Sequence, residues 1–472
     1  MEAGSRAGAG WHLVGAGGSG MNGLALLLAA RGERVSGCDL RDSPALEELA
    51  AAGLPVEARH RPEHAARAGR LVVSRAVRPD HPEVEEALRR GRSVEYRGER
   101  LAALFNPSRR GIAVAGSHGK STTAGWIGWA LLRAGLEPAV YVGARLGGLG
   151  RAALPGRGDY FVAESDESDG SFQLLHPWLA VVTNVDDDHL ERYGGMGPMA
   201  DAFRRFVDGV RPGGAALLAA DDPLLARFRS PVRIVTYGLG AGELRAVDLR
   251  STPRGEAFRL RWHGRDMGVW RIRLHGLHNV ANALAVIGVL ALVGLEPERI
   301  RRLVAGYPGV ERRLQPLGTA AGRRLYDDYG HHPAEVAAVL RAARKLAGRG
   351  RLLVVFQPHR YSRTLRLAEA FGPALALADR VWVMPVYAAG EEPLEGADAG
   401  RVAEAVRAAG GRAELVAGAE EAARAAAAGS RTGDLILTLG AGDVYTVAAE
   451  LRRRLIGEKA VGSGGTLRGR DP

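Results

Sequence analysis

The stretch AVAGSHGKSTTAG, residues 113–125, joins a short apolar run to a glycine-containing turn and the start of a helix. It contains Lys120, one of three lysines in a chain whose 64 basic residues are otherwise arginines. Gly116 and Gly119 allow backbone N–H groups to turn toward an anion, and the helix that follows directs its positive end to the same place. The stretch therefore predicts a strand, a phosphate-binding loop and a helix, which is a unit of an α/β fold.

The loop is shorter than a standard phosphate loop. A Walker A sequence has glycine, four residues and then Gly-Lys-Ser/Thr, but Val114 stands at the position of that first glycine. Lys120 still offers a compact charge that fits between β- and γ-phosphate oxygens, and the Ser121 hydroxyl can bind Mg²⁺. The alternative is a plain strand-to-helix turn, which leaves the scarce lysine unexplained.

Similar short apolar runs on both sides of this stretch divide the chain into three strand-rich blocks. Runs bounded by turn residues are typical of buried parallel strands. In the first block, one strand is expected to begin at Trp11, a second to end at Asp39 and a third to cover 71–77. The strands expected in the second block lie in 159–166, 178–186, 215–222 and 233–238. Those expected in the third block lie in 324–330, 351–359, 380–387 and 434–443. A β-hairpin decoration is expected over 241–275.

Size and composition restrict the classes of protein. A chain of 472 residues suggests about three domains. The net charge of +11 fits either nucleic-acid binding or small anionic substrates. The arginines are spread along the chain and do not alternate with aromatic residues, so we expect no nucleic-acid partner.

Cysteine content and hydropathy further restrict the possible classes of protein. Cys38 is the only cysteine, which excludes an internal disulfide and a metal site made of several cysteines, and fits the cytoplasm. No run approaches the roughly 20 apolar residues of a membrane span, so no membrane insertion is expected.

Acidic residues end two strands of the second block. FVAESDESDG contains Glu164, Asp166, Glu167 and Asp169, and TNVDDDHLE contains three aspartates and His189. Such a cluster beside a triphosphate implies a divalent cation, which prefers oxygen ligands. Glu164 and His189 are the predicted ligands, with Ser121; most of the other acids are expected to be solvated.

The sequence GAGGSGM, residues 15–21, is close to the dinucleotide fingerprint and is followed by Asp39 about twenty residues on. NAD is one interpretation, with Asp39 on a ribose hydroxyl. The same turn suits any ribose diphosphate, including a UDP-sugar, so it indicates a pyrophosphate and not a nicotinamide.

Three further polar clusters follow the second block. In HNVANA, His278 and Asn282 lie on one helix face, and Asn279 is either an N-cap or an adenine contact. DDYGHHP contains paired histidines, but no third ligand has the spacing of a metal site. FQPHRYSRT places His359, Arg360 and Arg363 together, either to bind carboxylates or phosphates or as an exposed basic turn.

Ten motifs then occur in one order: GAGGSGM, GSHGKST, AESDESDGSF, TNV-x-x-DH, HNVANA, ERR, DDYGHHP, FQPHRYSRT, YAAGE-x-P and GAGD. Over residues 11–455 the chain resembles the Mur ligase family. This resemblance implies an α/β protein with a Rossmann-like UDP-sugar domain (1–108), a central P-loop ATPase domain with a mostly parallel sheet (109–306) and a Rossmann-like C-terminal ligase domain (307–472).

The resemblance also implies an activity. The expected reaction joins L-alanine to the carboxylate of UDP-N-acetylmuramate at the expense of ATP, through an acyl phosphate, in cytoplasmic peptidoglycan precursor synthesis. Mg²⁺ is the expected cofactor, with Mn²⁺ as an alternative, and the protein is expected to be a monomer or weak homodimer. A related ligase that adds a murein tripeptide, an NAD-dependent oxidoreductase and a basic nucleic-acid-binding ATPase are the alternatives.

Site residues follow from the resemblance, position by position. The expected catalytic residues are Lys120, Glu164, His189, Asp328 and His332, and either His189 or an aspartate near 328 could be the general base. The expected ATP contacts are Gly116, Ser117, His118, Gly119, Lys120, Ser121, Thr122, His278, Asn279, Asn282, Arg313 and Asp328. The expected UDP-sugar contacts are Gly15, Gly17, Gly18, Ser19, Gly20, Met21, Asp39 and Ser74. His332, His359, Arg360 and Arg363 are expected on the carboxylate and alanine side.

Overall fold

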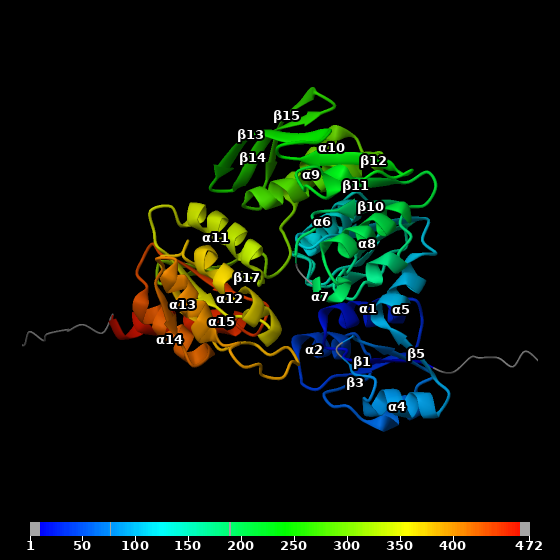
Figure 1. The fold of residues 1–472 in the computed structure, drawn as a ribbon, viewed down its shortest axis with the longest axis horizontal. Helices are drawn as coiled ribbons and strands as arrows, with labels where there is room; N and C mark the ends of the chain where they lie inside the picture. The colour runs from blue at the N-terminus through cyan, green and yellow to red at the C-terminus, as the bar shows by residue number, and fades with distance from the viewer. Residues whose placement is uncertain (1–9, 76, 188–189, 463–472) are drawn as a thin grey trace, which may run out of the picture. The chain divides into compact units, whose positions relative to one another are not determined.

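Apolar runs that alternate with helical stretches form sheets with helices on both faces, as the α/β prediction requires. The computed structural model describes residues 10–75, 77–187 and 190–462, and this part of the chain contains three β-sheets (Figure 1). Two compact units contain them. The first unit extends to Glu311, apart from 251–253 and 275–277, and includes the first two sheets; the second unit includes those two short segments and the chain from Arg312 onward.

The first sheet is parallel, with the strand order β3-β2-β1-β4-β5 among the described residues. Its strands are β1 (Trp11–Val14), β2 (Val35–Cys38), β3 (Val56–Glu57), β4 (Arg70–Val73) and β5 (Ser93–Tyr96). Its helices are α1 (Ser19–Ala30), α2 (Pro44–Ala51), α3 (Pro62–Arg67), α4 (Pro82–Arg89) and α5 (Arg97–Phe105). The strand expected over 71–77 is shorter than predicted and ends before Ser74.

Side-chain alternation gives this sheet two buried faces. Trp11 and Leu13 pack into the core that contains α1, α2 and α5, whereas Val14 and Cys38 pack with α3 and α4. The doubly wound arrangement leaves the GAGGSGM turn at the carboxyl end of β1, where open α/β sheets bind their ligands.

The second sheet has the order β15-β14-β13-β12-β11-β10-β6-β9-β7-β8 over the described ranges. Its strands are β6 (Arg110–Ala115), β7 (Ala139–Tyr141), β8 (Ala153–Leu154), β9 (Tyr160–Glu164), β10 (Leu179–Val182), β11 (Ala215–Ala219), β12 (Arg233–Gly238), β13 (Leu244–Thr252), β14 (Gly255–Trp262) and β15 (Arg265–Ile272). Its helices are α6 (Lys120–Arg133), α7 (Leu190–Tyr193), α8 (Met196–Asp208), α9 (Leu277–Leu292) and α10 (Pro297–Gly306), with short 3₁₀ turns at Ser171–Leu174 and Leu225–Arg227.

The centre of this sheet is parallel, with β6 between β9 and β10. The predicted hairpin over 241–275 is present as β13 to β15, of which β14 and β15 are antiparallel and extend one edge of the sheet. The polar ends of β6, β9 and β10 therefore meet at one edge, because carboxyl ends of parallel strands lie together.

The third sheet has the order β16-β17-β21-β18-β19-β20 in the described part of the second unit. Its strands are β16 (Gln315–Ala320), β17 (Arg323–Asp328), β18 (Leu352–Phe356), β19 (Arg380–Val383), β20 (Ala413–Leu415) and β21 (Leu435–Leu439). Its helices are α11 (Pro333–Ala347), α12 (Tyr361–Leu375), α13 (Ala399–Ala408), α14 (Ala419–Gly429) and α15 (Tyr445–Gly462).

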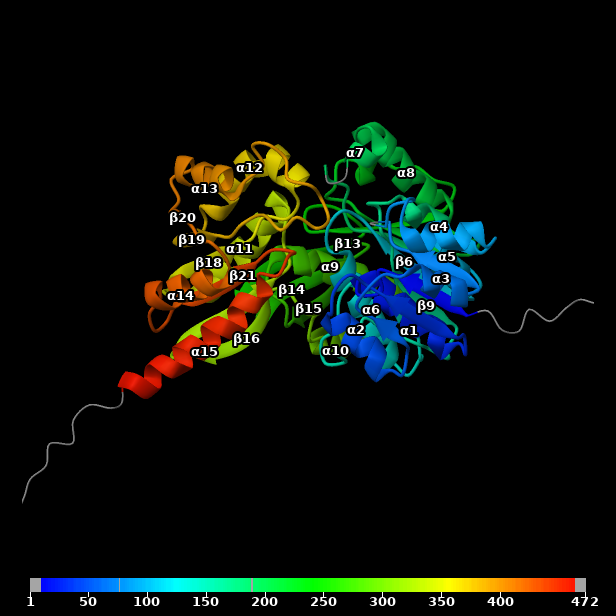
Figure 2. The ribbon, with the colours of Figure 1, turned by 90° about the horizontal axis from the view of Figure 1, so that it is seen from below.

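Side chains that alternate along the strands of the third sheet again form two separate cores, one on each face. Leu352, Val354 and Phe356 pack with α11, α12 and α13, whereas Leu353 and Val355 pack with α14 and α15, two helices that contact each other (Figure 2). None of the helices in the described part of the chain combines the length and the apolar character needed to cross a bilayer.

Candidate active site

The phosphate loop follows β6 and leads into α6, as predicted. Gly116 has φ +132° and Gly119, the residue before α6, has φ +82°, values that favour glycine. A Cβ atom added to Gly116 would lie 2.1 Å from Thr183 Oγ1, and one added to Gly119 would lie 2.7 Å from Asn282 Oδ1. Both glycines therefore allow the positive φ of the loop and also allow Thr183 and Asn282 to pack closely against its backbone.

The end of β10 holds this loop in place. The backbone N–H of His118 donates to Asn184 Oδ1 (2.8 Å), and Thr183 Oγ1 donates to the His118 carbonyl (2.6 Å). The Asp186 N–H donates to Ser117 Oγ (2.9 Å). The TNVD sequence thus supports the loop through Thr183 and Asn184, two roles that sequence reasoning did not assign although both polar residues end a central strand.

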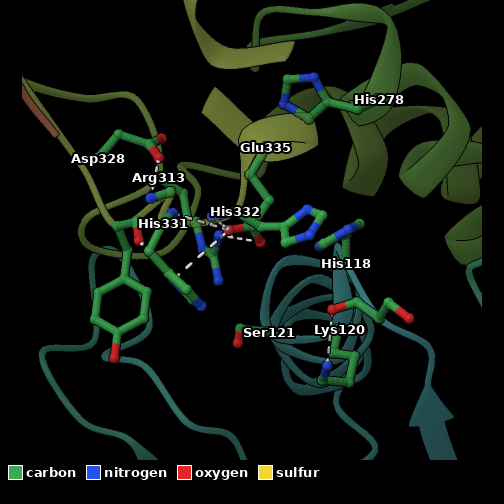
Figure 3. Close-up of polar contacts among 12 residues, drawn as sticks. His118, Lys120, Ser121, His278, Arg313, Asp328, His331, His332 and Glu335 are labelled. Atoms are coloured by element: carbon green, nitrogen blue, oxygen red, sulfur yellow. Dashed lines mark hydrogen bonds and ion pairs between the residues drawn. The ribbon is translucent and has the colours of Figure 1, made fainter. Parts of the chain in front are cut away.

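Lys120 is at the first position of α6 and points back into the loop (Figure 3). Its Nζ donates to the carbonyls of Gly116 (2.6 Å) and Ser117 (3.0 Å) and lies 2.7 Å from Glu167 Oε2. Burial lowers the pKa of Lys120, but the carboxylates of Glu167, Asp166 and Glu164 outweigh burial and raise it. The ammonium group therefore stays charged at the place where a phosphate would meet the loop.

Glu167 is a functional candidate that the sequence did not single out. The expectation of solvated loop acids is wrong for Glu167, which is 1% exposed, and for Asp169, which is also buried. Burial raises the pKa of Glu167 to about 7, although Lys120 acts in the opposite direction. Glu167 is identified as a candidate by its contact with Lys120 in the folded chain, and its spacing along the sequence does not indicate this contact.

Ser121 and Glu164 converge at the same helix end. Ser121 Oγ donates to Glu164 Oε1 (2.7 Å), and Glu164 Oε2 accepts from the Gly143 N–H (2.6 Å). A hydroxyl and a carboxylate side by side are the oxygen ligands that Mg²⁺ prefers, so these residues fit a magnesium ion. The third predicted ligand, His189, lies outside the described residues. Thr122 is buried within α6.

Helix α9 reaches the same loop. Asn279 is the third residue of α9, so its interpretation as an N-cap is wrong. Its side chain accepts from Asn282 Nδ2 (3.2 Å) and lies 3.1 Å from His278 Nε2. Since Asn282 also contacts Gly119, the structure brings the HNVANA cluster to the phosphate loop.

The GAGGSGM turn joins β1 to α1. Gly15 has φ +85°, and an added Cβ atom there would lie 3.4 Å from the Ser74 Cβ. The Gly17 N–H donates to Asp39 Oδ2 (2.8 Å). Gly18 precedes α1. Asp39 thus shapes the turn, and Ser74 lies beside it.

The rest of the motif enters the first helix. Ser19 begins α1, and Met21 is buried in it. A Cβ atom added to Gly20 would lie 2.6 Å from Arg97 Nη1 and 2.7 Å from the Tyr141 hydroxyl. These two side chains, from α5 and β7, were missed by sequence reasoning.

Arg97 joins the glycine turn to the acidic end of β9. Its Nη2 donates to Asp166 Oδ2 (2.6 Å) and lies 3.5 Å from Asp169 Oδ2. Burial raises the pKa of Asp166, but Arg97 and Lys120 outweigh burial and lower it well below its usual range. Asp166 is therefore an ionised carboxylate that is bound by Arg97 and is also stabilised by the charge of Lys120.

The second unit contains its own polar cluster, after β17 (Figure 3). Asp328 Oδ2 accepts from the Leu314 N–H (2.6 Å) and Oδ1 accepts from the Gly330 N–H (2.7 Å). Burial raises the pKa of Asp328 to about 6. His332 caps α11 in a reciprocal arrangement with Glu335, whose carboxylate lies 3.6 Å from Arg313.

Three predicted substrate-binding residues follow β18 in the same unit. His359 Nδ1 lies 3.3 Å from Arg363 Nη1, and the His359 ring stacks on Tyr387 with centroids 5.6 Å apart. Burial, His331 and Arg363 lower the pKa of His359 to about 3. Arg360 has φ +70° at the residue before α12. Arg363 is 7% exposed, so an exposed basic turn does not describe it.

Family models match along the chain in the same order as the domains expected from the sequence. Residues 11–109 match "Mur ligase family, catalytic domain", 114–290 match "Mur ligase middle domain", and 312–442 match "Mur ligase, glutamate ligase domain". Two curated relatives carry the name UDP-N-acetylmuramate–L-alanine ligase. The protein of Kineococcus radiotolerans is 45% identical, with 93% of this chain and 95% of that protein covered; the protein of Solibacter usitatus is 43% identical, with 94% and 95% covered.

Solved structures show the same architecture. The UDP-N-acetylmuramate-alanine ligase of Thermotoga maritima matches with a TM-score of 0.83 and 25% identity, over 96% of this chain and 99% of that one. A murein peptide ligase of Psychrobacter arcticus matches with a TM-score of 0.72 and 22% identity, over 95% and 99%, and supports the fold alone.

Proposed function

This chain belongs to the Mur ligase family, and from that premise we propose that it joins L-alanine to the carboxylate of UDP-N-acetylmuramate with ATP in peptidoglycan precursor synthesis. The family assignment agrees with the resemblance seen in the sequence. The observation that carries the proposal from family to chemistry is the charged, partly buried Lys120 in a glycine loop, next to the Ser121–Glu164 pair.

The first step activates the sugar carboxylate. Amide formation needs a leaving group, and attack of the carboxylate on the γ-phosphate gives an acyl phosphate and ADP. In such a reaction the protein contributes position and charge stabilisation more than covalent chemistry. We assign Lys120 and the loop N–H groups to the phosphates, with Ser117, His118 and Thr122 in the supporting loop and first turn.

Magnesium fits this site through oxygen ligands. We propose Ser121 and Glu164 as ligands, with His189 as a third and Mn²⁺ as an alternative metal. The ion would help to neutralise the charge that develops on the phosphates. The side chains of His278, Asn279 and Asn282 are assigned to the adenosine part because they border the same loop.

The sugar nucleotide is assigned to the first sheet. Gly15, Gly17 and Gly18 form a turn before the N-terminus of α1, and Gly20 lies in its first turn, an arrangement that favours a diphosphate. Asp39 and Ser74 border that turn, and Ser19 and Met21 continue it.

The second step forms the amide. The amine of L-alanine attacks the acyl carbon, the phosphate leaves, and the amine loses its proton to a base. We assign His332, His359, Arg360 and Arg363 to the carboxylates, and Arg313 and Asp328 to the nucleotide. Asp328 and His189 remain the candidate bases. Because burial keeps His359 neutral, Arg363 supplies the charge of that pair.

A phosphate-release assay with ATP, UDP-N-acetylmuramate and one amino acid at a time tests the proposal. Release is expected with L-alanine and little with D-glutamate. Release with a murein tripeptide in place of alanine would favour the related peptide ligase, and turnover that does not need the sugar nucleotide would reject the assignment. Sedimentation distinguishes the proposed monomer or weak homodimer from larger assemblies, and cell fractionation tests the proposed cytoplasmic location.

A further inference from the structure

A second cluster of metal-binding side chains lies in the first sheet, on the face covered by α3 and α4. His12 of β1, Cys38 of β2, His64 of α3 and Glu83 of α4 offer ligand atoms that all lie within 4.8 Å of one another. All four residues are buried. They come from four elements and are separated by 19 to 71 positions in the chain, so no sequence spacing indicates the cluster.

The distances between these ligand atoms suit a small tetrahedral ion. His12 Nε2 lies 3.2 Å from Cys38 Sγ and 3.2 Å from Glu83 Oε2, and Cys38 Sγ lies 3.2 Å from Glu83 Oε1. His64 Nδ1 lies 3.1 Å from Glu83 Oε1. In a tetrahedral zinc site the bond lengths place ligand atoms about 3.3–3.6 Å apart. These four distances are therefore within a few tenths of an ångström of those in such a site, and the remaining ligand-atom distances are at most 4.8 Å.

The outer nitrogen of each histidine faces an oxygen atom. Ser36 Oγ donates to the Trp11 carbonyl (3.4 Å), so it can accept a hydrogen bond from His12 Nδ1, 2.9 Å away. His64 Nε2 faces Glu57 Oε1 at 3.4 Å. In the tautomers that carry the ring proton on these outer nitrogens, the inner nitrogens of both rings present lone pairs toward Glu83. This is the arrangement by which neighbours orient metal-binding histidines.

A neutral histidine lone pair next to a carboxylate oxygen is repulsive unless a positive charge lies between them. The Glu83 carboxylate is fully buried, and the inner nitrogens of His12 and His64 lie 3.2 and 3.1 Å from its oxygens. Without an ion, the ring protons must lie on these inner nitrogens instead, and Glu83 Oε1 also accepts from the Arg61 N–H (2.9 Å). A divalent cation at the centre would satisfy all four groups together.

We propose that His12, Cys38, His64 and Glu83 form a structural zinc site in the first domain. The ligand set of two nitrogens, one sulfur and one oxygen matches zinc in softness, whereas magnesium and calcium prefer oxygen alone. Four protein ligands leave no open position, which is typical of structural and not catalytic zinc. The ion would fasten β1 and β2 to α3 and α4.

Entry and proton release both have a route. A cavity of about 440 Å³ is lined by His12, Ser36, Glu57 and His64, among others, and so reaches the cluster. When the sulfur–metal bond forms, the thiol proton must leave. His60 Nδ1 lies 3.1 Å from Cys38 Sγ and its side chain is 15% exposed, so it can receive that proton and pass it to water.

Cobalt substitution of the full-length chain tests the site, because Cys38 is the only cysteine. The chain is stripped with a chelator and titrated with Co²⁺ and then Zn²⁺. We expect a thiolate-to-cobalt charge-transfer band and intense visible bands of four-coordinate cobalt, both reaching their maximum at one equivalent and lost on addition of Zn²⁺. Absence of the charge-transfer band would overturn the proposal.

Variants separate this site from other metal-binding groups. Cys38→Ser should abolish the charge-transfer band, and His64→Ala should weaken zinc binding at least about 100-fold, whereas His263→Ala, at an exposed histidine, should change neither. Zinc should also raise the melting temperature of the native chain and not that of His64→Ala. If circular dichroism shows a folded Cys38→Ser protein with unchanged cobalt spectra, the metal lies elsewhere and the proposal is wrong.

Discussion

At the scale of single residues, Lys120 has the largest predicted effect on the reaction. Lys120→Ala removes the charge that we assign to the phosphates, and loss of one such group reduces turnover by roughly 100-fold or more. The phosphate-release assay measures this change. Lys345→Ala is the matched control, because Lys345 is exposed on α11; equal losses in both variants would contradict the assignment.

Glu167 gives a prediction about pH. Its pKa in the folded chain, about 7, is above the ordinary value of 4.5, so its protonated form is favoured by folding. Its contribution to stability is therefore fully present below about pH 4.5 and is lost as the pH rises to 7. The Glu167→Gln side chain cannot ionise, so the variant keeps this contribution at all pH values. As the pH rises from 5 to 8, the free energy of unfolding of the variant should therefore increase relative to that of the native chain, by at most about 3 kcal/mol.

Urea denaturation of both proteins at several pH values measures that difference. The comparison removes the contribution of every other titrating group that the two proteins share. A difference that is constant across this range, or that changes in the opposite direction, would show that Glu167 is ionised throughout.

At the scale of elements, the junction between β6 and α6 depends on Gly119. Gly119→Ala introduces a Cβ atom at φ +82° and 2.7 Å from Asn282 Oδ1. We expect a loss of about 1–2 kcal/mol in stability and weaker ATP binding, because the loop or α9 must move. Thermal denaturation and nucleotide titration measure the two effects.

Gly135→Ala is the control for this prediction. Gly135 follows the same helix with φ +73°, but an added Cβ atom there meets nothing within 4 Å. Backbone strain alone should lower the stability of that variant while ATP binding stays unchanged. If both variants bind ATP like the native chain, close contact at Gly119 does not shape the nucleotide site.

At the scale of the whole molecule, Arg97 links the first two sheets of the first unit. Its guanidinium group, on α5, bonds to Asp166 after β9. Removing one partner of a mostly buried pair leaves the other unpaired, so Arg97→Met should lower stability by about 3 kcal/mol. Hydrogen exchange should show lost protection in both sheets.

An exposed ion pair provides the comparison. Arg78 and Asp80 form a pair with side chains 81% and 61% exposed, so Arg78→Met should change stability by less than about 1 kcal/mol. Protection lost only around α5 in Arg97→Met would mean that the two sheets open independently.

The sequence by itself determined the α/β class, the positions of most central strands, the phosphate loop and the family. These features are local: apolar runs of strand length, glycines that permit a turn and a lysine before a helix are visible in consecutive residues. The polar strand ends also indicated where ligands bind, because parallel strands end at one edge.

Only the tertiary structure decided which distant side chains meet. Glu167 becomes a buried partner of Lys120, Arg97 reaches Asp166 from another sheet, and Asn282 lies against Gly119. Asn279 lies inside its helix, and His12 and Glu83 come together across 71 positions. Burial and pairing depend on how separate elements pack against each other, and consecutive residues carry no information about the distance between elements.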